Sequence, residues 1–142
     1  MKLLKHANVY TPAPLGKRDV LIEGERILRI AEEITGYDEL PDVDVYDLSG
    51  KTLVPAYIDL HVHITGGGGE QGPASRVPES SLSTFFKNGI TTVVGLLGTD
   101  GITRSLENLV AKARALTEEG MTVYTLTLSL IHISEPTRPI SI

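Results

Sequence analysis

No cysteine occurs among the 142 residues, which excludes disulfide bonds and thiolate metal sites. A metal ion would have to be held by histidine, by carboxylates or by a modified lysine. The longest apolar runs fall far short of the ~20 residues that a membrane-spanning helix requires. Charged residues interrupt the apolar residues of segment 1–6 too early for a signal peptide. We therefore expect a cytoplasmic protein with no membrane partner.

The sequence also lacks any cluster of basic residues. Its 13 Lys and Arg residues are scattered, and 18 Asp and Glu residues give a net charge of -5. Binding to nucleic acid depends on clustered positive charge, so we expect no nucleic-acid partner. The hydrophobic share of 41% and the charged share of 22% are typical of a globular protein with a core of its own.

The first 54 residues predict short β-strands joined by tight turns. Segments 18–23 and 26–31 flank Gly24 and are typical of a hairpin, because glycine adopts the positive φ that such turns need. Segments 44–48 and 51–54 flank a second turn signal, Ser49-Gly50. This region predicts a small β-sandwich or an antiparallel layer.

The pattern changes at Pro55 to an alternation of strands and helices. The expected order is a strand over 56–64, a helix from Pro78 to Gly89, a strand over 90–97, a helix over 105–119 and a strand over 121–127. The first helix carries an apolar stripe of Leu82, Phe85 and Phe86. A β-α-β-α-β order predicts an α/β fold with parallel strands and right-handed crossovers.

The tail over residues 128–142 departs from this pattern. Its segment 128–138, LSLIHISEPTR, resembles the translation of a transposon-type sequencing adapter. We therefore interpret the tail as non-native and set His132 aside as a ligand.

The segment that best indicates chemistry is Asp59-Leu60-His61-Val62-His63. Side chains at alternate positions of a strand point the same way, so Asp59, His61 and His63 should project together. Two imidazoles one pleat apart can hold one metal ion through neutral nitrogen lone pairs. Asp59 would orient a ligand or lie deeper in the same row. Without its setting, however, a His-x-His pair is more often an ordinary surface or core pair.

Three motifs resemble a known family. Segment 53–63, LVPAYIDLHVH, resembles the first-strand signature of the amidohydrolase superfamily, with Ala56 where that family commonly has glycine. Segments 61–73 (HVHITGGGGEQGP) and 93–104 (VVGLLGTDGITR) resemble the isoaspartyl dipeptidases within it. The resemblance covers residues 1–127. It implies part of a small N-terminal β-sandwich over 1–54, followed over 55–127 by the start of a (β/α)8 TIM-type barrel with about three βα units.

The resemblance also implies residue roles. His61 and His63 would bind the more buried of two zinc ions. Glu70 would receive the free α-amino group of a β-aspartyl dipeptide, and Gly68 (through its backbone) and Thr99 would hold the aspartyl end. Hydrolysis in this family uses a hydroxide that bridges the two zinc ions, and the parent would be a homo-oligomer. The carboxylated lysine that bridges the metals, two further histidines and the catalytic base belong to later strands. No catalytic residue is therefore assigned here, and we expect the 142-residue chain alone to be inactive.

Each of these roles has an ordinary alternative. The glycine run can be only a flexible loop, Glu70 a solvated carboxylate, and Thr99 or Asp100 a turn or cap residue. Asp100 is left out of the candidate site for that reason.

Alternatives to the function also stay open. Another amidohydrolase, such as a dihydroorotase, a hydantoinase or an N-acyl-amino-acid deacylase, would share the metal strand but is not expected to carry the Gly-Gly-Gly-Gly-Glu loop. A non-catalytic relative would be expected to lose its metal ligands, and a fragment without a function of its own is a third reading.

Overall fold

The structure is a computed structural model that describes residues 1–100 and 103–126. The chain divides into two compact units, Met1–Pro55 and a second unit that begins at Ala56. The boundary falls where the sequence pattern changes, and each unit is described by itself below. The tail over 128–142, with His132, lies outside the described residues. Within the described part of the chain, no helix is long and apolar enough to cross a membrane.

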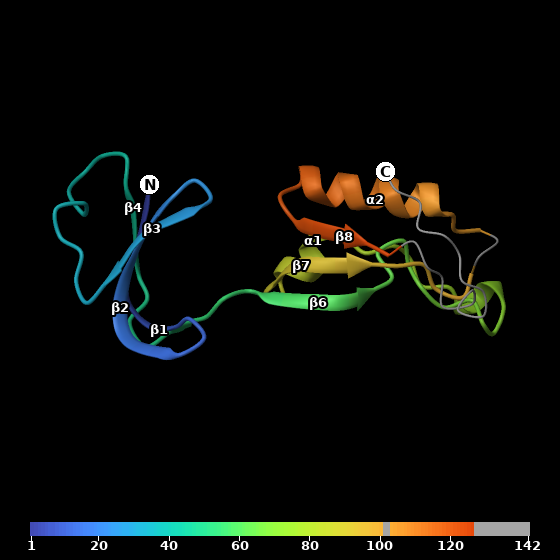
Figure 1. The fold of residues 1–142 in the computed structure, drawn as a ribbon, viewed down its shortest axis with the longest axis horizontal. Coiled ribbons are helices and arrows are strands. Elements are labelled where there is room, and N and C mark those ends of the chain that lie inside the picture. The colour runs from blue at the N-terminus through green and yellow to red at the C-terminus, as the bar shows by residue number, and fades with distance from the viewer. Residues whose placement is uncertain (101–102, 127–142) are drawn as a thin grey trace. The chain divides into compact units, whose positions relative to one another are not determined.

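The first unit is built on one mixed sheet (Figure 1). Its strands are β1 (Lys2–Tyr10), β2 (Pro14–Glu23), β3 (Arg26–Ala31), β4 (Asp44–Asp47) and β5 (Thr52–Leu53). The order is β3-β2-β1-β4, and β5 also pairs with β1. The predicted hairpin is confirmed, because β2 and β3 pair antiparallel around Gly24, whose φ is 54°. Buried apolar side chains form two small clusters on this sheet, around Leu3, Leu21 and Ile34 and around Ala7, Val9 and Val20.

The expected antiparallel layer is correct for β1 to β3 and wrong for β4 and β5, which both run parallel to β1. The turn between β4 and β5 does not reverse the chain onto β4. The backbone N–H of Leu48 donates to Lys5, and the N–H of Asn8 donates to Lys51. The chain thus continues along β1 past a bulge centred on His6, which has a φ of 62°. The carboxylate of the buried Asp19 accepts the N–H of His6 at 2.8 Å and stabilises this bulge.

The second unit is an α/β layer with a three-stranded parallel sheet. Its elements are β6 (Tyr57–Val62), η1 (Pro73–Ser75), α1 (Leu82–Phe86), β7 (Ile90–Gly95), α2 (Leu106–Glu118) and β8 (Thr122–Thr125). The order β6-β7-β8 confirms the predicted parallel alternation. Helix α1 packs on β7 and α2 on β8 (Figure 1).

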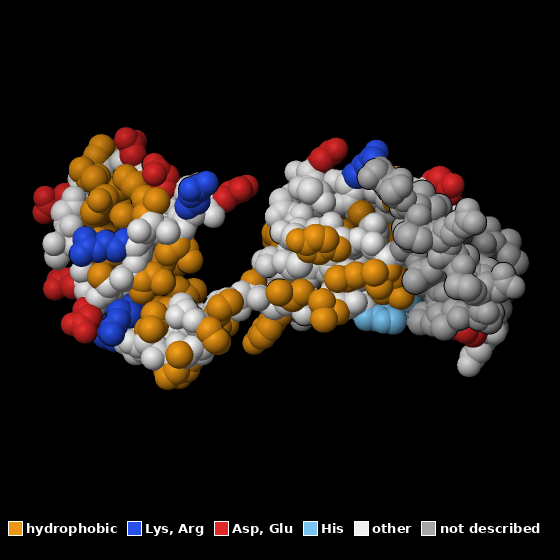
Figure 2. Space-filling model, in the orientation of Figure 1, with side chains coloured by type: hydrophobic (Ala, Val, Ile, Leu, Met, Phe, Trp, Pro, Cys, Tyr) orange, Lys and Arg blue, Asp and Glu red, His pale blue; other side chains and the backbone are white. Residues whose placement is uncertain are grey.

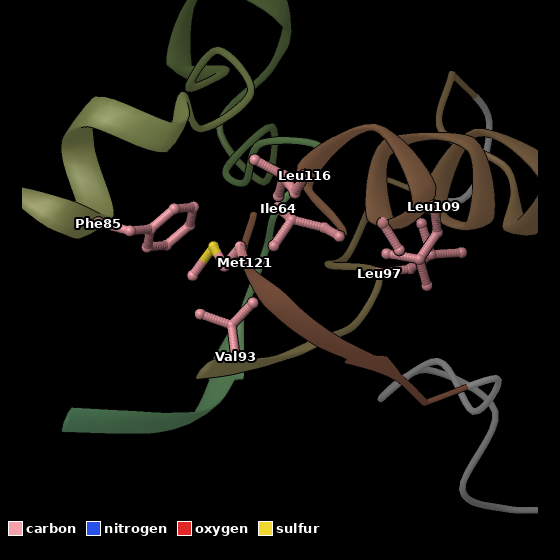
Figure 3. Packing of buried hydrophobic residues seen from close by; sticks show 8 residues of the cluster. Ile64, Phe85, Val93, Leu97, Leu109, Leu116 and Met121 are labelled. Carbon is pink, nitrogen blue, oxygen red and sulfur yellow. The ribbon is translucent and has the colours of Figure 1, made fainter. Parts of the chain in front are cut away.

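One core holds these helices on the sheet (Figure 3). The apolar face of α2 contributes Leu109, Ala113 and Leu116, which are spaced for one face of a helix. The buried residues of the sheet and loops that meet it are Ile64, Val93, Leu97 and Met121, with Phe85 from α1. Each large side chain buried here contributes roughly 1.5–3 kcal/mol. The core thereby fixes where the carboxyl ends of β6 and β7 lie, and the candidate site is built on those ends.

The first predicted helix begins later than expected. It starts at Leu82 after Ser81, whose backbone is extended, and not at Pro78. The chain around Pro78 is held extended by tertiary hydrogen bonds, since Val77 donates to Gly67 and Ser80 donates to Ile64. Phe86 is 44% exposed, so only part of the predicted stripe is buried.

Candidate active site

The two histidines of the His-x-His pair lie at the carboxyl end of β6. His61 is the penultimate residue of the strand, and His63 follows Val62, its final residue. Their ring centroids are 5.3 Å apart and the rings are nearly perpendicular, at 87°. His61 is exposed and His63 is half-buried, and histidine is visible on the surface of this unit (Figure 2). The strand geometry therefore brings both rings together, as expected for two ligands of one ion.

Contacts around His63 determine which ring nitrogen is available. Its Nδ1 lies 3.3 Å from the carbonyl oxygen of Leu96, which follows β7. A carbonyl oxygen only accepts, so Nδ1 carries the proton and Nε2 of the neutral ring keeps its lone pair. The ring also has glycines beside it, since a Cβ at Gly67 or Gly98 would lie 3.5 Å from its atoms. His63 is thus oriented by backbone, in the way that outer contacts commonly fix a metal-binding imidazole.

Asp59 does not act on an imidazole in this structure. Its Oδ1 accepts the backbone N–H of His61 at 3.1 Å. This contact supports the end of the strand.

The segment from Gly66 to Val77, termed the glycine loop below, is closed at its neck. The backbone N–H of Val77 donates to the carbonyl of Gly67 at 2.8 Å. Gly66 and Gly68 have φ values of 91° and 69°, and a Cβ at either would lie 2.3 Å from a backbone oxygen. Glycine is required at both positions, because any side chain would clash and be strained. These contacts define how the loop folds back on itself in the structure.

Inside the loop, the hydroxyl of Ser75 makes three further contacts. It accepts the backbone N–H groups of Gly69 and Gln71 at 3.2 and 3.3 Å and donates to the carbonyl of Gly72 at 2.9 Å. These bonds shape the turn that carries Glu70.

Glu70 lies in the loop after β6 and contacts Thr99, which lies in the loop after β7. The hydroxyl of Thr99 donates to Oε1 of Glu70 at 2.6 Å. That hydrogen bond is the main reason that the pKa of the Glu70 carboxyl lies below its ordinary value. A hydrogen bond from its own backbone lowers the pKa further. The Glu70 carboxylate therefore stays ionised to a lower pH than an ordinary glutamate side chain.

A cavity of about 280 Å³ adjoins this pair. Its lining consists of Gly69, Glu70, Gly72, Pro73, Arg76, Thr99, Asp100 and Thr103. Of the predicted substrate residues, Glu70 and Thr99 line it together. Gly68 lies in the glycine loop two residues before Glu70 and is not among the lining residues of this cavity.

Sequence reasoning missed a charged network beside the cavity. The side chain of Arg104 is only 4% exposed, and its Nη1 and Nη2 donate to the carbonyls of Gly67 and Val77 at 3.1 and 2.8 Å. Asp100, which is outside the candidate site predicted from the sequence, lies 3.2 Å from Nε of Arg76 and 4.0 Å from Nη1 of Arg104. It also accepts the backbone N–H of Thr103 at 2.9 Å. A single arginine before a helix gives no sequence signal of burial.

The residues present fit part of a metal site. His61 and His63 supply two imidazoles of suitable spacing, and the hydrogen bond of His63 leaves its Nε2 free to bind. Over residues 1–100 and 103–126, no group of three or more His, Asp or Glu side chains is arranged to hold a metal ion. A stable site for a metal such as zinc needs three or four ligands, so further ligands would have to join this pair.

Comparisons with known proteins find similarity to a dipeptidase, a hydantoinase and a dihydroorotase. No family model matches the chain. The β-aspartyl dipeptidase of Fervidobacterium islandicum AW-1, solved in complex with a β-Asp-Leu dipeptide, is 47% identical with a TM-score of 0.81, over 90% of this chain and 33% of that one. The D-hydantoinase of a Thermus species is 26% identical with a TM-score of 0.56, over 78% of this chain and 23% of that one.

Among curated proteins, the dihydroorotase of Staphylococcus aureus (strain N315) is 32% identical over 111 residues, which are 78% of this chain and 25% of that protein. The chain thus spans about a third of the length of the β-aspartyl dipeptidase and a quarter of that of the dihydroorotase. The β-aspartyl dipeptidase exceeds the D-hydantoinase both in sequence identity and in TM-score. The resemblance to the isoaspartyl dipeptidases of the amidohydrolase superfamily, which the motifs indicated, is therefore confirmed.

Proposed function

We propose that the full-length protein hydrolyses β-aspartyl (isoaspartyl) dipeptides with the help of zinc. The observation that carries this proposal is the hydrogen bond between Thr99 and Glu70. It places the carboxylate at a cavity between the loops that follow β6 and β7. The histidine pair lies at the carboxyl end of β6, where the first of these loops begins. The 47% identity to a dipeptidase solved with β-Asp-Leu supports the same substrate class.

His61 and His63 would hold one zinc ion through their unprotonated ring nitrogens. A bound zinc ion lowers the pKa of water and polarises a carbonyl. The protein's own part is to orient His63 through the carbonyl of Leu96 and to keep the free nitrogen facing away from it. Residues outside this chain would supply a carboxylated lysine, two more histidines and the catalytic base. They would also help to hold a second zinc ion.

Glu70 would bind the α-amino group of the substrate. Its carboxylate is ionised at neutral pH, and the hydrogen bond from Thr99 lowers its pKa, so that the ionised form persists to lower pH. An ionised carboxylate forms a charge-assisted hydrogen bond with an ammonium group. Thr99 has one proton to donate and directs it to Oε1, which leaves Oε2 for the substrate. Gly68 would offer its backbone to the aspartyl end of the substrate, where a side chain would clash with Ser75.

The β6-β7-β8 unit supports a finer account of the fold. We infer that it is the start of a (β/α)8 barrel, in which sites lie at the carboxyl ends of the strands. Both loops of the candidate site follow such ends. The five-stranded unit would then be part of the β-sandwich that accompanies the barrel. A cytoplasmic homo-oligomer remains the prediction for the parent.

A second candidate function is hydrolysis of cyclic amides. The similarity to a dihydroorotase and a D-hydantoinase favours it. A cyclic amide such as dihydroorotate has no free α-ammonium for Glu70, so this alternative leaves the Glu70–Thr99 pair without a role.

The experiment that tests the proposal is an assay of the purified full-length protein, loaded with zinc, on β-Asp-Leu. Release of free aspartate and leucine is the expected result. Hydrolysis of dihydroorotate or a hydantoin in its place would favour the second candidate. The 142-residue chain alone is expected to be inactive, since two imidazoles bind zinc weakly and the base that would move the proton belongs to a later strand of the family.

A further inference from the structure

Arg104 is a buried cation that the proposed chemistry does not use. It precedes α2, and only 4% of its side chain is exposed, so it cannot meet a substrate in the cavity directly. Burying a guanidinium is costly unless its N–H groups are satisfied and its charge is balanced. The contacts that stabilise it therefore indicate what it does.

The Arg104 guanidinium donates two hydrogen bonds, and both go to the neck of the glycine loop. Nη1 donates to Gly67 and Nη2 donates to Val77, and these two residues are themselves joined by a backbone hydrogen bond. One planar side chain thus holds the start and the end of the loop together. It also ties the loop to the start of α2, which is fixed by the core.

Asp100 balances the charge and adds a second tie. Its carboxylate lies near Arg104 and contacts Nε of Arg76, the residue before Val77 in the loop. Asp100 follows Thr99 directly. The residue that bonds Glu70 is therefore next in the chain to the residue that pairs with the loop's arginines.

The glycine loop that carries Glu70 is held at two places. The Arg104 and Asp100 contacts fix the neck of the glycine loop, and the Thr99 bond meets the carboxylate near the loop's opposite end. Removing the ties at the neck would let the loop move relative to Thr99. The carboxylate would then lose its set position at the cavity.

We propose that Arg104 is a positioning residue for Glu70: by holding the neck of the glycine loop against the start of α2, it sets the affinity for the substrate's α-amino group. The role rests on the proposed dipeptidase function. It requires arginine in particular, because a planar guanidinium donates to two carbonyls at once, whereas the ammonium of lysine is a single point.

The test is a double-mutant cycle in the full-length protein, with zinc bound and β-Asp-Leu as substrate. Arg104→Lys is measured in the wild type and in Glu70→Gln. In the wild type we expect KM to rise on the order of tenfold while kcat changes by less than about twofold, because ground-state binding is what is lost. In the Glu70→Gln background the same change should alter kcat/KM by less than about twofold, because residues that act through one another are not additive.

A matched control is Arg114→Lys on the exposed side of α2, which should keep the wild-type kcat/KM. Zinc content and the thermal unfolding midpoint are measured for every variant, so that loss of metal or of fold is seen separately. Zinc content should stay at the wild-type value.

Three results would overturn the role of Arg104 alone. They are an unchanged KM in Arg104→Lys, an equal loss of kcat/KM in both backgrounds, and a variant that loses zinc or does not fold, which would assign Arg104 to the general structure. A wild-type protein that does not hydrolyse β-Asp-Leu would instead contradict the proposed function, and this role with it.

Discussion

The hydroxyl of Thr99 donates a 2.6 Å hydrogen bond to the carboxylate of Glu70, although 29 residues separate them in the chain. Each lies in a loop that follows a strand of the same parallel sheet. The carboxyl ends of neighbouring parallel strands lie at one edge, so residues distant in sequence can form one site there. The pair is the strongest structural link between this chain and binding of an amine.

Glu70→Gln in the full-length protein tests the role of this carboxylate. Glu70 is exposed in this chain, and in the proposed function the bound substrate and the rest of the full-length protein would cover it. Loss of the ion pair to the substrate ammonium should then lower kcat/KM by ~30- to 1000-fold, since charge-assisted hydrogen bonds are strong. Zinc content should not change. The control is Glu79→Gln, whose partner Lys112 lies 3.2 Å away at an exposed site where an ion pair contributes little. Loss of zinc would make Glu70 a ligand or a support, and wild-type activity would make it a solvated carboxylate.

Thr99→Val tests the pH dependence. Thr99 stabilises the ionised carboxylate and lowers the pKa of Glu70, so amine binding should persist as the pH falls until it passes that lowered pKa. Without the hydroxyl the pKa rises, and the acid limb of the kcat/KM profile should move to higher pH. At neutral pH we expect a loss of roughly tenfold. Thr117→Val, which removes a hydroxyl within α2, is the matched control. An acid limb that does not move would argue against the Thr99 contact.

Gly68→Ala tests the conformation of the glycine loop. The added Cβ would lie 2.3 Å from the carbonyl oxygen of Ser75 at a φ of 69°, so the loop has to shift. Gly72→Ala is the control, because Gly72 has a φ of 96° but open space around its Cβ. Both changes should cost on the order of 1–3 kcal/mol of backbone strain, and only Gly68→Ala adds a clash. We expect kcat/KM for β-Asp-Leu to fall further in Gly68→Ala, and equal losses in the two variants would show that the clash is relieved without effect.

His63→Gln tests the metal site. The imidazole Nε2 left free by the Leu96 contact is the proposed ligand atom, and glutamine does not replace it as a zinc ligand. After dialysis, zinc per chain measured by atomic absorption should fall below the wild-type ratio in the full-length protein, with circular dichroism unchanged. Full zinc content in this variant would exclude His63 as a ligand.

The sequence predicted those parts of the molecule that follow from local patterns. The β-α-β-α-β alternation predicted the parallel order of β6, β7 and β8, and the period of a strand predicted that His61 and His63 lie together. The glycines at positions 66 and 68 belong to the motif over 61–73, and the structure shows why no other residue fits there: a Cβ at either would lie 2.3 Å from a backbone oxygen.

The remaining features depend on contacts between distant segments. Arg104 reaches carbonyls that lie 37 and 27 residues earlier in the chain, and nothing in its neighbours predicts that it is buried. Likewise, the parallel direction of β4 comes from its pairing with β1, and the late start of α1 comes from the bond between Ser80 and Ile64. Local preference at Pro78 allowed both a helix start and an extended chain.

The most direct test of the central claim is the ratio of kcat/KM for β-Asp-Leu to that for α-Asp-Leu, with dihydroorotate and a hydantoin assayed beside them on the same zinc-loaded, full-length protein. In the proposed function, Glu70 and Thr99 hold an aspartyl head group that carries its own free amine, and α-Asp-Leu presents that amine in a different place relative to the scissile bond. We predict a ratio on the order of 100 or more, because a site built for hydrogen bonds rejects a substrate that leaves them unmade. A ratio near one, or faster hydrolysis of dihydroorotate or the hydantoin than of β-Asp-Leu, would contradict the account.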